Sequence, residues 1–376
     1  GKVPPWGEAT TGKGAAPACE VSGSDMALLP YTSGTTGLPK GCVHLHSSLM
    51  HNAVAGSLWG TATPESVVLC VVPMFHITGM VSVMHTTIYA GGTLVIMPRW
   101  DRDLAGRLIS RYKVSNWTNI PTMVIDLLAS PRFAEYDLSS LVYMGGGGAA
   151  MPQAVAQRLL DNYGLRYVEG YGLTETAAPS HSNPVDDPKQ QCLGIPFMST
   201  DARVIDPDTL QEMPVGEQGE IIMHGPEVFQ GYWKRPDATA QAFIEFEGKK
   251  FFRSGDLGRM DEDGYFFLTD RLKRMINASG FKVWPAEVEA LMFRHPAIQE
   301  ACIISTQDAY RGESVKAVVV LRATHKDTTE QQMIDWCREN MAVYKVPRTV
   351  QFVDTLPKSG TGKVMWRALQ EAEAKT

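Results

Sequence analysis

The pattern of apolar and polar positions divides this chain of 376 residues into successive parts. Between about residues 25 and 170, short apolar runs of strand length alternate with longer segments of helical periodicity. This alternation predicts a parallel-rich sheet covered by helices, with ligands in the loops beyond the carboxyl ends of the strands. The expected strands are Met26–Tyr31, Val67–Val72, Thr93–Met97, Leu141–Met144 and Arg166–Glu169. The expected helices are Ser47–Trp59, Met80–Tyr89, Leu104–Tyr112, Thr122–Ala129 and Pro152–Tyr163.

After about residue 191 the pattern changes to short strands and turns, as in DARVID, GEIIMHG and GYFFLTD. These segments predict a small β subdomain that ends near residue 270. We therefore expect a large N-terminal domain over residues 1–270, with its α/β part ending near residue 190, and an α+β C-terminal domain over residues 271–376. The elements expected in the C-terminal domain are helix Ala286–Phe293, strands Ala301–Ser305 and Val315–Leu321, helix Glu330–Met341 and a last helix after Lys363.

The composition is that of an ordinary globular protein, with 44% hydrophobic and 20% charged residues. No apolar run approaches the roughly 18 residues of a membrane span, and no signal peptide is visible. Together with scattered cysteines that form no CxxC pair, this favours a cytoplasmic protein. His44, His46 and His51 have no carboxylate or cysteine among them, so we expect no metal site there.

The charge of the chain is uneven. The net charge of −6 argues against a nucleic-acid surface. Residues 274–376 nevertheless hold 14 Lys and Arg against 12 Asp and Glu, so the excess of acidic residues lies in the preceding part. A slightly basic C-terminal piece that faces an acidic body would suit a lid over a polyphosphate.

The first motif with evident chemistry is TSGTTGLPKG, residues 32–41, which directly follows an expected strand. Its glycines let backbone N–H groups turn inward as an anion-binding nest, its hydroxyls add donors, and its lysine adds a positive charge. It is not the usual mononucleotide loop GxxxxGK[ST], because its glycine spacing differs and its lysine follows a proline. The residues that we expect to contact phosphate are Thr32, Ser33, Gly34, Thr35, Thr36, Gly37 and Lys40.

A second motif, GYGLTE at residues 170–175, follows what looks like an edge strand. Tyr171 offers a flat ring on which a purine can lie, and Thr174 offers a hydroxyl. Glu175 offers a hard oxygen ligand that suits Mg²⁺. By itself the hexamer is a weak signal, equally typical of a plain turn.

Three further motifs follow in the second half of the chain. FRSGDLG places Asp256 after a tight turn, where its carboxylate could accept hydrogen bonds from both hydroxyls of a ribose. DRLKRMINASGFKVWPAEVE brings Arg271, Lys273 and Lys282 around a glycine-centred turn, and PKSGTGKVMWRAL presents Lys363 on a glycine-flanked loop. Taken singly, each of these charged segments is typical of a solvated face.

In this order and at these intervals, the five motifs resemble those of the adenylate-forming superfamily, which contains acyl-CoA synthetases, luciferases and the adenylation domains of peptide synthetases. The resemblance extends from about residue 25 to residue 370. It implies that the loop at residues 32–41 holds the β and γ phosphates that leave as pyrophosphate. It further implies that Tyr171 stacks on adenine, Thr174 contacts the α-phosphate and Glu175 binds Mg²⁺.

The same resemblance implies roles in the rest of the site. Asp256 and Arg271 would hold the ribose, and Lys273 would be the hinge of a mobile C-terminal domain. Lys363 would bridge the α-phosphate and the carboxylate of the acid. Asn277 stands where some relatives carry a lysine, so no cationic role is carried over there. The remaining implied positions are Ala149, Glu169, Gly170 and Gly172 at the ATP, His76, Gly146 and Gly147 at the acyl site, and Gly280, Phe281 and Lys282 on the coenzyme A side.

The expected function is that of an AMP-forming acid–thiol ligase that uses ATP, Mg²⁺ and coenzyme A as its small-molecule partners. The four glycines at residues 145–148 leave room for a medium or long aliphatic chain, unless they serve only close packing. An aryl-acid CoA ligase, an enzyme that loads a carrier protein, and luciferase chemistry stay open, as does assembly into a homo-oligomer. Because only 31 residues precede Thr32, fewer than in relatives, an inactive ligand-binding fragment is a further alternative.

Overall fold

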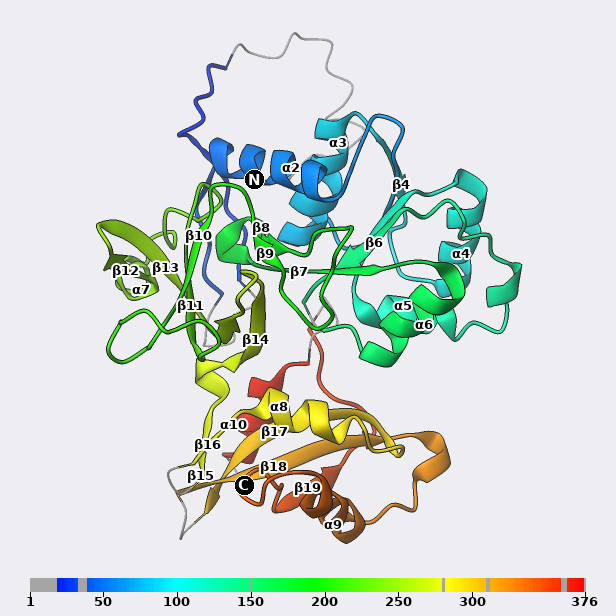
Figure 1. The fold of residues 1–376 in the computed structure, drawn as a ribbon, viewed down its shortest axis with the longest axis vertical. Helices are drawn as coiled ribbons and strands as arrows, with labels where there is room; N and C mark the ends of the chain where they lie inside the picture. Colours follow the sequence, from blue (N-terminus) through cyan, green and yellow to red (C-terminus); the bar gives the residue numbers. More distant parts are fainter. Residues whose placement is uncertain are drawn as a thin grey trace, which may run out of the picture.

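The computed structural model describes residues 19–32, 39–148, 150–278, 281–308, 312–359 and 364–374. Its largest sheet has seven strands in the order β4-β3-β5-β6-β7-β8-β9 (Figure 1). Strands β3 to β7 pair in parallel and β8 and β9 are antiparallel, which confirms the predicted parallel-rich α/β fold. The strands are β3 (Val67–Cys70), β4 (Thr93–Ile96), β5 (Asn116–Asn119), β6 (Tyr143–Gly146), β7 (Tyr167–Leu173), β8 (Ala178–Ser182) and β9 (Ile195–Pro196).

Helices cover both faces of this sheet. Buried Leu69, Trp117 and Met144 face α4, α5 and α6, whereas Val68 and Cys70 face the helical segment η1. The helices are α2 (His46–Trp59), α3 (Thr86–Ala90), α4 (Arg102–Tyr112), α5 (Pro121–Leu128) and α6 (Gln153–Tyr163), with a π-helix η1 (Thr78–His85) and short 3₁₀ turns η2 (Phe133–Glu135) and η3 (Thr174–Thr176). No helix in the described part of the chain is long and apolar enough to cross a membrane.

Two details of the large sheet differ from the sequence-based expectation. The run at residues 26–31 does not enter the large sheet: β1 (Met26–Leu28) pairs with β2 (His44–Leu45) in a separate antiparallel pair. The run ends early because Pro30 has no N–H with which to extend a ladder. Conversely, β5 was not expected, because its sequence NWTN is not an apolar run. Its asparagine side chains are instead satisfied internally, as in the bond from Asn116 Nδ2 to the carbonyl of Gly60.

A second, antiparallel sheet follows, with the order β10-β11-β13-β12 and β14 paired to β13. Its core contains Phe229, Phe252 and Phe266 together with Ile221 and Met223. This is the β subdomain that the sequence predicts, and it lies beside the large sheet in Figure 1. Its elements are β10 (Asp201–Ile205), β11 (Gly219–His224), α7 (Pro236–Ala242), β12 (Phe243–Phe246), β13 (Lys249–Met260) and β14 (Phe266–Arg271).

The remaining chain forms a third sheet, drawn below the other two in Figure 1, with α8 and α9 on one face and α10 on the other. The chain enters it through the 3₁₀ turn η4 (Leu272–Arg274), where the hinge is predicted. The exact domain limits stay a prediction. The elements are β15 (Ile276–Ala278), β16 (Phe281–Val283), α8 (Pro285–Met292), β17 (Ile298–Asp308), β18 (Gly312–Leu321), η5 (Ala323–His325), α9 (Glu330–Asn340), β19 (Thr349–Phe352) and α10 (Trp366–Glu373).

Candidate active site

The ends of the predicted phosphate loop are joined by hydrogen bonds. The backbone N–H of Thr32 donates to the carbonyl of Lys40 over 2.9 Å, and the N–H of Lys40 donates to the Thr32 hydroxyl over 3.3 Å. Tyr31 and Gly41 pair in an isolated β-bridge, so the described residues on either side of the loop lie next to each other. Five of the predicted phosphate ligands lie outside the described residues, namely Ser33, Gly34, Thr35, Thr36 and Gly37.

The segment that returns from the loop runs along residues 229–233. The N–H of Trp233 donates to the carbonyl of Gly41, and the N–H of Val43 donates to the carbonyl of Gly231. This pairing places Tyr232 beside the loop: the Lys40 ammonium lies 3.8 Å from the centre of the Tyr232 ring. The Tyr232 hydroxyl in turn donates to Glu175 Oε1 over 2.7 Å. The structure thus joins the lysine of the first motif to the glutamate of the second.

The motif GYGLTE occupies the end of β7 and the turn that follows. Because β8 returns antiparallel to β7, with Gly170 opposite Ser182, β7 is an interior strand and the expectation of an edge strand is wrong. The turn begins at Thr174, in η3. The carbonyl of Thr174 accepts a 2.7 Å hydrogen bond from Nε2 of His44. Burial lowers the pKa of His44 to about 4, so its imidazole is neutral and Nε2 carries the donated proton.

Tyr171 is buried in this conformation, with 8% of its surface exposed. Its hydroxyl donates to Asp256 Oδ2 over 2.6 Å, and its ring lies edge-on to the ring of His181. Burial, reinforced by Asp256, raises the pKa of Tyr171, so the hydroxyl keeps its proton and acts as a donor. The ring is therefore presented as part of a packed cluster rather than as the open platform that the sequence suggests, and stacking on adenine stays a prediction.

Asp256 and Arg271 are brought together by strand pairing. They are register partners on β13 and β14, and Arg271 Nε lies 2.8 Å from Asp256 Oδ1. The Asp256 carboxylate raises the pKa of Arg271, and Glu175 is among the other groups that act on it in the same direction. Tyr171, Glu175, Asp256 and Arg271 thus form one electrostatic neighbourhood, although Asp256 and Arg271 come from two motifs other than GYGLTE.

Glu169 lies on β7, two residues before Tyr171 of the candidate site. It is buried, and its carboxylate accepts hydrogen bonds from the N–H groups of Met151 and Gln191, at 2.8 and 2.5 Å. Burial raises the pKa of this carboxyl above its ordinary value. Glu169 therefore ties the segment after β6 to β7, and the contact with ATP that the sequence implies stays a prediction. Ala149, on the same segment, lies outside the described residues.

The glycines at the end of β6 allow neighbouring backbones to approach closely. A Cβ atom on Gly146 would lie 1.8 Å from the carbonyl oxygen of Asn119, and one on Gly147 would lie 2.3 Å from that of Gly170. A Cβ on Gly172 would likewise lie 1.9 Å from the carbonyl oxygen of Ala178. This observation favours the alternative that the glycines serve close packing, and it weakens the argument from them for a long acyl pocket.

Replacing Gly146 with alanine is expected to destabilise the large domain by about 3 kcal/mol or more, because the new methyl group meets backbone that cannot move aside locally. Chemical denaturation measures this effect. Gly23→Ala is the control, since its Cβ would meet only Ser47 Cβ at 3.7 Å. If the two variants lost the same small amount of stability, the close approach at Gly146 would be wrong.

His76 lies at the same edge of the sheet as these motifs. Strands β3, β6 and β7 share one direction, so the residues that follow their carboxyl ends meet at one edge: His76 after β3, Gly147 after β6 and Thr174 after β7. His76 Nδ1 accepts a hydrogen bond from the N–H of Thr78 over 3.2 Å. The neighbouring Phe75 is 79% exposed. The placement is compatible with the predicted acyl site, which no contact in the structure tests.

The C-terminal residues of the predicted site are partly described. Phe281 is exposed and stacks on Tyr344 with ring centres 5.0 Å apart, and Lys282 is exposed beside it. Asp270, the last but one residue of β14, accepts a hydrogen bond from the N–H of Ala286 in the first turn of α8 over 2.6 Å. The side chain of Lys273, and all of Gly280 and Lys363, lie outside the described residues.

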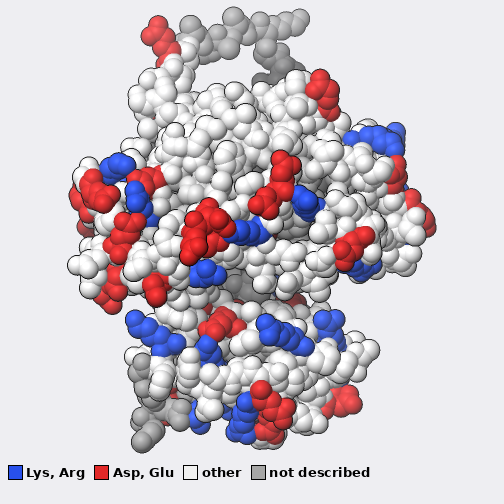
Figure 2. Space-filling view, viewed as in Figure 1, with Lys and Arg blue, Asp and Glu red and all other residues white. Residues whose placement is uncertain are grey.

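Figure 2 shows Lys and Arg side chains along the edge of the C-terminal part that faces the larger part. This agrees with the uneven distribution of charge along the sequence. Positive charge at this edge suits a surface that approaches a polyphosphate.

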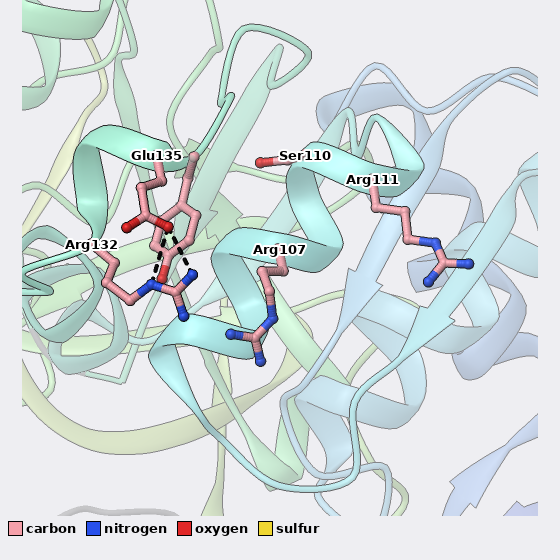
Figure 3. Close-up of a pocket in the computed structure, with 6 residues that line it drawn as sticks. Arg107, Ser110, Arg111, Arg132 and Glu135 are labelled. Carbon is pink, nitrogen blue, oxygen red and sulfur yellow. Dashed lines mark hydrogen bonds and ion pairs between the residues drawn. The ribbon is translucent and has the colours of Figure 1, made fainter.

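A surface hollow of about 280 Å³ on α4 and η2 contains none of the predicted site residues (Figure 3). It is lined by three arginines, of which Arg132 is paired with Glu135 at 2.7 Å. Figure 3 shows the side chain of Arg111 directed away from Arg107 and Arg132. The arginines therefore do not converge on a common point.

Glu227 is fully buried at the turn between β11 and the segment of Tyr232. Oε1 accepts from the Thr200 hydroxyl, whereas Oε2 has no partner in the described part of the chain. Burial raises the pKa of this carboxyl, although Thr200, His51 and His224 act in the opposite direction. The ordinary pKa of a glutamate carboxyl is about 4.3. As the pH rises above this value, the Glu227 carboxyl loses its proton in the unfolded chain before it does so in the folded protein. This carboxyl therefore makes the free energy of unfolding fall as the pH rises.

Glu227→Gln is therefore expected to raise the free energy of unfolding at pH 7, and its advantage over the wild type should shrink as pH falls towards 4. Urea denaturation across this range measures the difference. The exposed Glu217→Gln is the control and should change little. A constant difference between wild type and Glu227→Gln at all pH values would contradict the assignment.

Two family models match the chain. Residues 3–233 match the AMP-binding enzyme family, and residues 287–363 match the AMP-binding enzyme C-terminal domain. The chain belongs to the AMP-binding enzyme family. This confirms its predicted membership of the adenylate-forming superfamily.

Other AMP-binding enzymes resemble the chain over most of its length. It is 38% identical over 352 residues to a long-chain-fatty-acid–CoA ligase of Bacillus subtilis (strain 168), a match that covers 93% of this chain and 62% of that enzyme. It is 36% identical over 366 residues to a feruloyl-CoA synthase of Amycolatopsis, covering 96% of this chain and 72% of that enzyme. The chain thus spans less than two thirds of the length of the Bacillus ligase.

Solved structures of this family have the same fold. ATP-bound MatB from Rhodopseudomonas palustris matches 95% of this chain and 70% of its own, with a TM-score of 0.89 and 33% identity. The o-succinylbenzoate CoA synthetase of Bacillus subtilis, in complex with its acyl-adenylate intermediate, matches with a TM-score of 0.83 and 29% identity, covering 93% of this chain and 70% of its own.

The residues of this AMP-binding enzyme fit a magnesium ion at Glu175. Oε1 of Glu175 accepts from Tyr232, and Oε2 has no hydrogen-bond partner among the described residues. The described part of the chain contains no group of three or more His, Cys, Asp or Glu residues that could hold an ion. Mg²⁺ is commonly held by one or two carboxylates together with the phosphates of a substrate, and Glu175 beside the phosphate loop fits that kind of site.

Proposed function

We propose that the protein containing this chain is an AMP-forming acid–thiol ligase. It would convert a carboxylic acid and ATP to an acyl-adenylate and pyrophosphate, and then transfer the acyl group to coenzyme A with release of AMP. The observation that carries the proposal is the convergence of Lys40, Glu175 and the Asp256–Arg271 pair, from four motifs, in a chain of this family. A cytoplasmic location is part of the proposal.

The chemical difficulty is to bring an anionic carboxylate to a polyanion. The protein must neutralise charge before the carboxylate oxygen can approach the α-phosphorus. Lys40 would neutralise the leaving phosphates, and Lys363 would lie between the carboxylate and the α-phosphate. Glu175 would hold Mg²⁺, which supplies further positive charge at the phosphates when it is bound.

The other residues would orient the nucleotide. Asp256 and Arg271 would hold the ribose, with the Asp256 carboxylate accepting hydrogen bonds from its hydroxyls. In the structure this carboxylate already accepts from Tyr171 and pairs with Arg271. The ribose hydroxyls would therefore bind Asp256 in place of Tyr171 and Arg271 or in addition to them, and the position of this carboxylate is already fixed. Fixed groups of this kind cost little reorganisation during the reaction.

The proposed acid is a medium- or long-chain fatty acid, and an aryl acid is the alternative. Relatives of both kinds are similar to the chain, with the fatty-acid ligase 38% and the feruloyl-CoA synthase 36% identical. Because Gly146 and Gly147 serve close packing, the glycines do not decide between the two acids.

A panel of fatty and aryl acids, incubated with ATP, Mg²⁺ and coenzyme A, tests the proposal. We expect AMP and acyl-CoA to form in equal amounts with at least one fatty acid. Acid-dependent release of ADP would contradict it. Formation of acyl-adenylate without any acyl-CoA would favour the carrier-loading alternative, and binding of ATP without either product would favour an inactive fragment.

A further inference from the structure

Tyr232 lies between two groups of opposite charge in the candidate site. Its hydroxyl donates to Glu175 Oε1 over 2.7 Å, and the Lys40 ammonium lies 3.8 Å from the centre of its ring. One side chain thus touches both the lysine of the phosphate loop and the carboxylate that fits Mg²⁺. The sequence gives no sign of this contact, because Tyr232 is 57 residues from Glu175 along the chain.

The backbone around Tyr232 is held on both sides. Cys42 pairs with Tyr232 in an isolated β-bridge, and the N–H of Tyr232 donates to the Thr239 hydroxyl over 2.9 Å. The N–H of Phe229 donates to the carbonyl of Glu175 over 2.9 Å, and the Phe229 ring lies edge-on to Tyr232 with centres 4.8 Å apart. Tyr232 is therefore held beside Cys42 on one side and beside the turn after β7 on the other.

The chemistry of the contact is directional. The Tyr232 hydroxyl carries the proton of the contact and donates it, because an ionised carboxylate can only accept hydrogen bonds. The bond engages Oε1 of Glu175 and leaves Oε2 available. The face of an aromatic ring attracts an ammonium group, so the ring restricts Lys40 to positions beside the same carboxylate.

We propose that Tyr232 is a positioning residue for the nucleotide: its hydroxyl orients Glu175, which would hold Mg²⁺, and its ring holds Lys40, which would contact the leaving phosphates. The proposal deepens the proposed function and rests on its assignment of Glu175 and Lys40. It makes Tyr232 responsible for the placement of Glu175 and Lys40 relative to each other.

Tyr232→Phe, which removes the hydroxyl and keeps the ring, tests the proposal. Binding of Mn²⁺ in the presence of α,β-methylene-ATP, followed by electron paramagnetic resonance, reads the ion without any turnover. We expect the affinity for Mn²⁺ to fall about tenfold, since loss of a group that orients a metal ligand typically has effects of this size. Tyr232→Leu, which also removes the ring, should in addition raise the KM for pyrophosphate in the exchange reaction.

Tyr265→Phe is a matched control. Tyr265 is as buried as Tyr232, its ring faces the ammonium of Lys189 at 4.2 Å, and its hydroxyl donates to the carbonyl of Asp187 over 3.0 Å. It lies on none of the site motifs, so Tyr265→Phe should leave Mn²⁺ affinity unchanged. Thermal unfolding of each variant separates loss of the fold from loss of positioning.

Folded Tyr232→Phe with an Mn²⁺ affinity within twofold of the wild type would overturn the inference. So would a wild-type chain that binds no Mn²⁺ in the presence of the nucleotide. A wild type that binds the ion, loses it in Tyr232→Phe and yet shows no acid-dependent pyrophosphate exchange would uphold the positioning role and overturn the proposed activity. The two proposals can therefore fail separately.

Discussion

Replacing Lys363 with alanine is expected to slow acyl-adenylate formation by roughly 10²–10³-fold, which is the scale of losing one preorganised donor at a developing oxyanion. The lysine would neutralise the carboxylate and the α-phosphate as they approach each other. Binding of ATP in the ground state should be affected less, because the phosphate loop and the ribose-binding residues lie elsewhere in the chain. Pyrophosphate exchange and equilibrium binding of ATP measure the two effects.

Lys358→Ala is the control for this variant. Lys358 precedes the same loop, and its ammonium lies 2.7 Å from the carboxylate of Glu300 in a half-exposed ion pair. Such pairs contribute little to stability, so this variant should keep its exchange activity. If Lys363→Ala exchanged pyrophosphate within twofold of the wild-type rate, the assignment of Lys363 would be wrong.

Replacing Lys273 with proline is expected to block thioester formation while adenylation largely survives. The proposed second step requires the C-terminal part to rotate about this residue, and proline fixes the φ angle on which such a rotation depends. Rapid-quench measurement of acyl-adenylate and acyl-CoA separates the two half-reactions.

The structure adds a contact that this rotation would have to break. Asp270, before the hinge, accepts a hydrogen bond from Ala286 of α8, after the hinge. The contact fixes α8 relative to β14 in the conformation described. Lys273→Ala, which keeps the backbone free, is the control that separates the side chain from the backbone. Equal loss of both half-reactions in Lys273→Pro would contradict the role of Lys273 as a hinge.

The elements with a clear hydrophobic period were predictable from the sequence. Helix α4 begins where Asp101 caps it, with its side chain accepting from the N–H of Leu104, and it ends near residue 112 as expected. Strand β5 was not predictable, because NWTN has neither an apolar run nor a strict alternation. This segment is a strand because it pairs with β3 and β6. Such pairing between segments that are distant along the chain leaves no pattern in the local sequence.

In the candidate site, too, some features were predictable from the sequence and others were not. Motifs rich in glycine and hydroxyl groups, such as residues 32–41, identify chemistry because few other functions need those residues together. The contacts that join the motifs were not predictable: the bond from Tyr171 to Asp256 spans 85 residues, and that from Tyr232 to Glu175 spans 57. The motifs therefore yield candidate ligands whose roles stay predictions, whereas Tyr232 and the hydrogen bonds of Glu169 to Met151 and Gln191 become evident only in the structure.

The central claim is that ATP is cut between its α and β phosphates by the acid itself. Exchange of radiolabelled pyrophosphate into ATP, measured with and without acid and in the absence of coenzyme A, tests this claim most directly. We expect exchange that requires the acid and Mg²⁺ but no thiol. Exchange that appeared only when coenzyme A was added, or acid-dependent release of inorganic phosphate in place of exchange, would contradict it.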